Sequence, residues 1–174
     1  MSVFESLSKE HALLLKLVGH LERAAAEKDE RAAARETRNI LLVLFKALKA
    51  HENLENLVFD DSPEAPSPAA YKALAGIESQ HRTLNELQKE AETILNTLTP
   101  EGGASIRELS LRLARLLRRH FDEEERLLWP SFNAYAGRST LHRLSRQARD
   151  QYRAMERDVN RYWAEVEAYG NGAR

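Results

Sequence analysis

The chain has 174 residues, a net charge of −1 and no cysteine. This length suits one domain, 1–174, with a sizeable core, and the charge balance provides no overall field that would attract nucleic acid or an anionic membrane. The lack of cysteine excludes disulfides, thiolate catalysis and thiolate metal sites. The start, MSVFESLSKEH, has no signal-peptide pattern, and no apolar run is long enough to span a bilayer. We therefore expect a cytoplasmic protein.

Apolar residues recur at helical spacing along the chain, and alternating strand patterns are absent. We predict helices over 3–27, 31–59, 69–97, 104–128 and 139–168. The breaks between them are AEKDER, the proline-rich DDSPEAPSP, TPEGG and WPSFNAYAG. Four long helices with short connections predict an all-α fold: an antiparallel up-down-up-down four-helix bundle over about 3–130, with an additional C-terminal helix.

The predicted last helix has one apolar stripe, with residues alternating three and four apart. Its members are Leu141, Leu144, Ala148, Tyr152, Met155, Val159, Tyr162 and Val166. Such a stripe packs on the bundle, or on another copy of the chain in a homo-oligomer. The many arginines of this helix alternate with acidic residues, which favours a solvated face over a surface for nucleic acid or an acidic partner.

Two short stretches resemble each other: HENLENLVFD at 51–60 and HFDEEERLLWP at 120–130. Each begins with His and has Glu four residues later, giving His51-x-x-x-Glu55 and His120-x-x-x-Glu124. The two copies are 69 residues apart, and His11 and His81 are 70 apart. The first two helices therefore look like a first copy of the next two, which predicts a pair of related helical hairpins.

The four histidines at 11, 51, 81 and 120 should lie at one height in the bundle. In an up-down bundle, two residues are level when they are equidistant from the loop that joins their helices. The midpoints of successive pairs fall at 31, 66 and 100–101, within or beside the three predicted breaks. Residues four apart share a helix face, so Glu55 and Glu124 should lie one turn from the histidine layer, toward the same end.

Four imidazoles and two carboxylates inside an apolar bundle are costly to bury unless something satisfies them. A pair of metal ions would do so, with each ion taking two histidines and both carboxylates bridging. Imidazole and carboxylate without thiolate suit iron, manganese or zinc, and bundle cores often hold di-iron carboxylate sites.

This ordered set resembles the His-His-Glu repeat of the hemerythrin-like, or HHE cation-binding, family. The resemblance covers about 5–130 and implies an antiparallel four-helix bundle around a non-haem, oxo- or hydroxo-bridged di-iron centre. By position, it implies that His11 and His51 hold one iron, that His81 and His120 hold the other, and that Glu55 and Glu124 bridge them. The metal ligands are thus expected to be His11, His51, Glu55, His81, His120 and Glu124.

One position departs from the pattern of the oxygen carriers in that family. They have a second histidine one turn after the third-helix histidine, where this chain has Asn85. One iron would then have one imidazole fewer, which leaves room for water or an exogenous ligand. In this respect the chain resembles bacterial members that are linked to nitric oxide, peroxide or iron handling.

Other polar residues near the motif have simpler interpretations. His20 is nine residues from His11, on the opposite side of its helix, and is expected to lie at the surface. His142 is interpreted as a surface or cap residue, with a place beside the site as the alternative. Glu52, Glu123 and Glu125 are interpreted as solvated; Glu52, next to His51, is also a candidate extra ligand.

Three functions follow from this pattern. The first is a di-iron protein that binds or reacts with dioxygen, hydrogen peroxide or nitric oxide, with peroxide decomposition or nitric oxide handling as its enzymatic form. The second is a non-catalytic protein that stores, senses or delivers oxygen or iron. The third is a helical interaction module with a vestigial site that docks through its last helix.

Overall fold

The computed structural model describes residues 1–60, 67–96, 102–135 and 138–171, and this part of the chain is helical with no β-strand. Its elements are α1 (Val3–Ala26), α2 (Glu30–Asp60), α3 (Pro68–Asn96), α4 (Gly102–Glu123), the π-helical η1 (Glu124–Leu128), α5 (Trp129–Tyr135) and α6 (Arg138–Asn171). The all-α prediction is confirmed. Pro63, Pro66 and Pro100, which mark two of the predicted breaks, lie outside the described residues.

The start of α1 shows why the first helix begins where it does. The Ser2 hydroxyl accepts a hydrogen bond from the Glu5 backbone N–H at 3.1 Å, and the Glu5 carboxylate accepts one from the Ser2 backbone N–H at 2.6 Å. This capping box satisfies backbone donors that the first helical turn cannot pair internally. It fixes the start of the helix that carries the first histidine of the motif.

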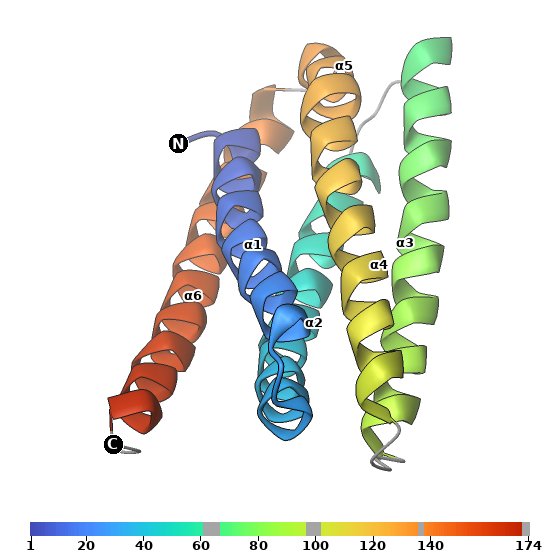
Figure 1. Cartoon of the computed structure of the whole chain (residues 1–174). Coiled ribbons are helices and arrows are strands. Elements are labelled where there is room, and N and C mark those ends of the chain that lie inside the picture. The colour runs from blue at the N-terminus through green and yellow to red at the C-terminus, as the bar shows by residue number, and fades with distance from the viewer. Residues whose placement is uncertain (61–66, 97–101, 136–137, 172–174) are drawn as a thin grey trace.

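The four long helices α1 to α4 form the bundle, and α6 lies along its outer side (Figure 1). Helix α1 packs against α2 and α4, α3 packs against α4, and α6 packs against α1 and α2. The buried residues of α6 belong to the predicted stripe: Leu144, Ala148, Met155, Val159 and Tyr162. The stripe therefore packs on the bundle, which was the first of the two predicted alternatives.

The apolar core consists of two clusters, one on each side of the histidine layer. On α1, Leu7 belongs to one cluster and Leu14 to the other, with His11 between them. On α2, Leu44 and Leu54 belong to different clusters, and His51 lies between them. The polar layer is thus enclosed by aliphatic side chains from above and below along the bundle axis.

The predicted end of the fourth helix at 128 is wrong. The stretch WPSFNAYAG was predicted to be a break, but its described residues, 129–135, are helical. The chain stays helical through η1 and α5 as far as Tyr135. Proline lacks an N–H, and its ring crowds the preceding turn, so an α-helix does not normally pass through it unchanged. Here a wide π turn precedes Pro130, with the Trp129 N–H bonded to the Glu124 carbonyl.

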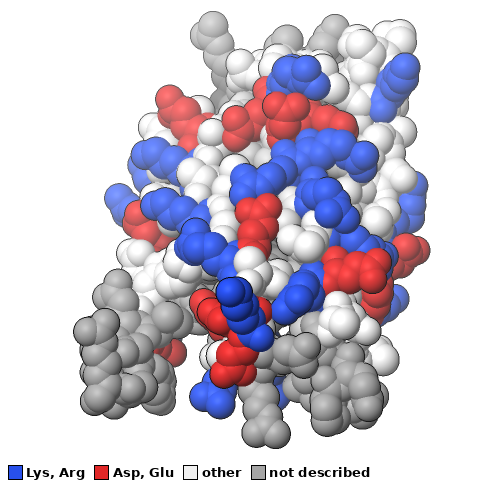
Figure 2. Space-filling model, viewed as in Figure 1, with Lys and Arg blue, Asp and Glu red and all other residues white. Residues whose placement is uncertain are grey.

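The face seen in Figure 2 carries lysine and arginine interspersed with aspartate and glutamate, without a large area of one sign. Ion pairs connect neighbouring helices, among them Arg118 with Glu22 at 2.7 Å and Arg112 with Glu90 at 3.0 Å. Exposed pairs of this kind contribute little stability each. Among the described residues, no helix is both long and apolar enough to cross a membrane.

Two adjacent leucines of α2 test the packing. Leu41 is 0% exposed and Leu42 is 60% exposed. We expect Leu41→Ala to lower the free energy of unfolding by about 2–5 kcal/mol, because it leaves a cavity in the core. Leu42→Ala should change it by less than about 0.5 kcal/mol. Urea denaturation of both variants measures the difference, and equal effects would mean that the α2 face is assigned wrongly.

Candidate metal centre

One histidine from each of α1, α2, α3 and α4 meets in the middle of the bundle, as the spacing predicts. The ring centroids of His11 and His51 are 4.6 Å apart, and those of His81 and His120 are 4.8 Å apart. The Nε2 atoms of His11 and His51 are separated by 2.9 Å. Three of the four residues are about 1% exposed, and the side chain of His81 is 12% exposed. The rings form two pairs, each from one helical hairpin.

Each of the two carboxylates lies between the histidine pairs. One oxygen of Glu55 is 3.3 Å from His51 Nε2, and its other oxygen is 3.4 Å from His81 Nε2. Glu124 does the same from the opposite hairpin: one oxygen is 3.1 Å from His120 Nε2 and the other is 3.2 Å from His11 Nε2. Both carboxylates therefore span the two halves of the site.

These six residues form two overlapping groups that could each hold a metal ion. The first comprises His11, His51, Glu55 and Glu124, and the second comprises Glu55, His81, His120 and Glu124. Within each group, one ligand atom per residue lies within 4.8 Å of all the others. The two glutamates belong to both groups, which is the arrangement expected of residues that bridge a pair of ions.

The polar atoms at the centre lack hydrogen-bond partners in the described part of the chain. They are both oxygens of Glu55, both oxygens of Glu124, and His81 Nε2. Both carboxylates are 0% exposed. A buried ionised carboxylate without compensation is strongly unfavourable, and divalent cations provide that compensation. The donor set of imidazole nitrogens and carboxylate oxygens fits two such ions.

The electrostatics of the cluster favour positive charge at His51 but not at His120. Burial opposes a charged imidazole at His51, but the Glu55 carboxylate and the hydrogen bond to Glu10 outweigh it and hold its pKa well above the usual value. Burial also opposes ionisation of Glu55, yet His51 holds the pKa of that carboxyl well below its usual range. Burial lowers the pKa of His120. The carboxylates thus attract cations, whether protons or metal ions.

The outer nitrogens of three imidazoles are held by further side chains. His51 Nδ1 is 2.8 Å from a Glu10 oxygen, and His120 Nδ1 is 2.9 Å from the Gln80 amide oxygen. These contacts repeat between hairpins, because Glu10 directly precedes His11 and Gln80 directly precedes His81. An Nδ1–H donated outward leaves the Nε2 lone pair facing inward, as metal binding requires.

Sequence reasoning missed these outer partners. Glu125 is exposed, as interpreted, but its carboxylate also lies 2.8 Å from His11 Nδ1. Glu123 is half-buried and accepts a hydrogen bond from Gln80 at 2.6 Å. The sequence offered one clue to these residues: each of them is the direct neighbour of a candidate ligand. Adjacency alone does not tell which of the three clustered glutamates turns inward.

The π turn lies directly at the site. It begins at Glu124, four residues after His120, and leads into Trp129. The rings of Trp129 and Phe121 both stack on the His11 ring, at centroid distances of 4.7 and 4.1 Å. A wide turn changes the direction of the residues that follow it, and such turns frequently occur at functional sites. Here the chain holds the His11 imidazole between two aromatic rings.

The remaining candidates lie outside both groups. His20 packs on the Trp163 ring of α6, with centroids 3.8 Å apart, so it is half-buried rather than a free surface residue. His142 is exposed and lines a hollow with Met1 and Arg149. Glu52 pairs with Lys49 at 3.0 Å and lies beside the site without belonging to either group.

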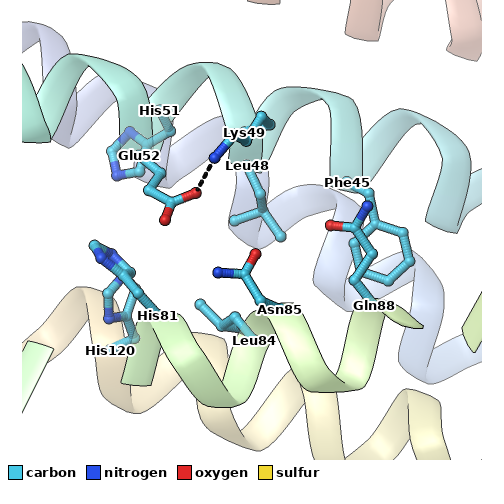
Figure 3. A pocket seen from close by; sticks show the side chains of 10 residues that line it. All are labelled: Phe45, Leu48, Lys49, His51, Glu52, His81, Leu84, Asn85, Gln88 and His120. Carbon is cyan, nitrogen blue, oxygen red and sulfur yellow. Dashed lines mark hydrogen bonds and ion pairs between the residues drawn. The ribbon is translucent and has the colours of Figure 1, made fainter. Parts of the chain in front are cut away.

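A small cavity of about 30 Å³ reaches the site between α2 and α3 (Figure 3). Its lining comprises Phe45, Leu48, Lys49, His51, Glu52, His81, Leu84, Asn85, Gln88 and His120. This volume holds one or two water-sized molecules. Asn85 occupies this lining where the oxygen carriers have a further imidazole. The cavity touches both histidines of the second metal group and, of the first group, His51 but not His11.

Comparison with protein families agrees with this geometry. The hemerythrin HHE cation-binding domain matches residues 2–130. The chain belongs to this family. The same domain also matches 72–172, a range that begins 70 residues after the start of the first match. That offset equals the spacing of His11 and His81, in keeping with two related hairpins. No curated protein and no solved structure matched the chain in the corresponding comparisons.

Ligand variants test the site of this hemerythrin HHE protein. We expect His51→Ala and His120→Ala each to reduce bound metal well below the wild-type amount, because each removes an inward-facing imidazole. His20→Ala is the control and should leave metal content unchanged, because His20 contacts α6 instead. Elemental analysis of metal-loaded proteins measures this. Full retention of metal in both ligand variants would contradict the assignment.

Proposed function

We propose that this protein holds two iron ions in the bundle core and uses them to bind or react with a small oxidant. His11 and His51 would hold one ion, His81 and His120 the other, and Glu55 and Glu124 would bridge them. The observation that carries this proposal is the span of the two carboxylates, since each has one oxygen beside each histidine pair.

Iron is the metal that the family and the donor set favour together. Manganese and zinc also accept imidazole and carboxylate ligands, so the geometry by itself supports a pair of divalent ions. The proposal of iron rests on membership of the hemerythrin family. A bound and reduced iron pair would supply electrons to dioxygen, hydrogen peroxide or nitric oxide.

The residues of the chain would control access to the pair. Two apolar clusters exclude water from above and below the polar layer. The cavity beside His81 and His120 is narrow, and its volume admits a diatomic molecule or peroxide rather than an organic substrate. Asn85 is exposed at this cavity, and no imidazole from that position would compete with an incoming ligand. These features support a small ligand at the second metal position.

A non-catalytic role in storing, sensing or delivering oxygen or iron is the second candidate. It uses the same site, so turnover is what separates the two. Both carboxylates are buried, and their oxygens have no hydrogen-bond partner in the described part of the chain. This argues against the third candidate, a vestigial site, because an unused site would retain that cost without the compensating ions.

Metal analysis and peroxide consumption test the proposal together. Protein produced with ample iron should contain about two irons per chain and should consume hydrogen peroxide over many turnovers if it is an enzyme. Two irons with only stoichiometric reaction would favour the binding or storage role. Near-zero iron after loading would contradict the proposal.

Asn85 provides a test of the access route. We expect Asn85→His to retain two irons but to slow reaction with nitric oxide or peroxide, because the larger ring enters the cavity and adds an imidazole beside His81. Glu86→His is the matched control and should react at the wild-type rate, since Glu86 is exposed on the same helix and does not line the cavity. Stopped-flow rates measure the effect. Unchanged rates in Asn85→His would mean that the ligand enters elsewhere.

A further inference from the structure

Helix α6 reaches the metal centre through one side chain. The Gln151 amide nitrogen lies 3.3 Å from each oxygen of Glu10, and one of these oxygens lies 2.8 Å from His51 Nδ1. The contacts form a chain from α6 through α1 to α2. The four-helix bundle thus receives a polar contact from the helix outside it, directed at one of its four central histidines.

Glu10, which lies between Gln151 and His51 in this series of contacts, depends on its hydrogen-bond partners. Glu10 is 0% exposed, so its carboxylate depends on donors from the protein. His51 Nδ1–H donates a hydrogen bond to one oxygen of Glu10. The Gln151 amide donates to the same carboxylate from the side of α6. A carboxylate fixed from both sides has little freedom to rotate. Its position determines where the His51 ring points, since Nδ1–H and Nε2 lie on opposite sides of the imidazole.

The equivalent contact in the second hairpin is chemically different. There His120 Nδ1 faces the neutral amide oxygen of Gln80, whose nitrogen donates to Glu123. A carboxylate partner makes an imidazole a stronger donor to a metal than an amide does. The two metal positions are therefore unequal, and Gln151 acts on the position whose histidine has the charged partner.

We propose that Gln151 is a positioning residue of the metal centre, which fixes the Glu10 carboxylate and thereby holds His51 Nε2 toward one of the two ions. This inference rests on the proposed function and adds a role for α6. The helix then acts on the His11–His51 position and leaves the His81–His120 position unchanged.

Gln151→Leu tests this role, because leucine has a similar size and donates no hydrogen bond. The matched control is Gln147→Leu, one turn earlier on α6 and exposed. We expect Gln151→Leu to release one of its two irons to a chelator several-fold faster than wild type, below the roughly 10–100-fold effect of losing the direct histidine partner Glu10. The second iron should leave at the wild-type rate, and Gln147→Leu should match wild type for both.

A purely structural role for Gln151 predicts a different result. Both irons would then leave faster together, and the metal-free variant would unfold at lower urea concentration. That outcome, or release rates equal to wild type, overturns the inference. If Gln151→Leu fails to fold, Glu10→Gln replaces it, since this change gives His51 an amide partner like that of His120. It should accelerate release of the same single iron.

A measurement on metal-free protein separates this inference from the proposed function. NMR follows the His51 Nδ1–H proton, which should shift in Gln151→Leu and stay unchanged in Gln147→Leu. If the proton shifts in Gln151→Leu but the wild-type protein binds no iron on loading, the positioning role is intact and the di-iron proposal is contradicted. Two bound irons, with no change in release rate or in the proton signal, would contradict the positioning role alone.

Discussion

The burial of two carboxylates between four imidazoles is the constraint on which the rest of the structure depends. Glu55 and Glu124 are removed from water, and ionised carboxylates are stable there only beside compensating charge. Every nearby feature serves this requirement. Imidazole Nε2 atoms surround the oxygens, outer acceptors orient three of the rings, and two apolar clusters close the layer. The bundle is built around a site for positive charge.

Much of this could be predicted from the sequence, because helix periodicity and loop positions determine height in an up-down bundle. The midpoints between His11, His51, His81 and His120 were sufficient to place four side chains in one layer. The first three helices begin and end within one or two residues of the predicted bounds. Regular geometry of this kind transfers directly from residue numbers to space.

The parts that were not predictable depend on local departures from regular geometry and on side-chain direction. Pro130 is normally read as a helix end, but here a π turn precedes it and the helical path continues. The contact of Glu125 with His11 Nδ1 likewise depends on which way each side chain points within a run of three glutamates. The link from Gln151 to Glu10 joins residues 141 positions apart, and no pattern in the sequence connects them.

Glu55 and Glu124 each contact histidines of both hairpins, and this has a consequence for assembly. Each histidine pair comes from one hairpin, but each pair also needs a glutamate from the other hairpin. Neither half of the chain could therefore complete either of the two candidate metal groups by itself. If the proposed ions bind, metal capture would depend on correct assembly, because tight binding would require the two hairpins to be docked in the right register. The ions would then cross-link the two halves, as a disulfide would in a protein that has cysteine.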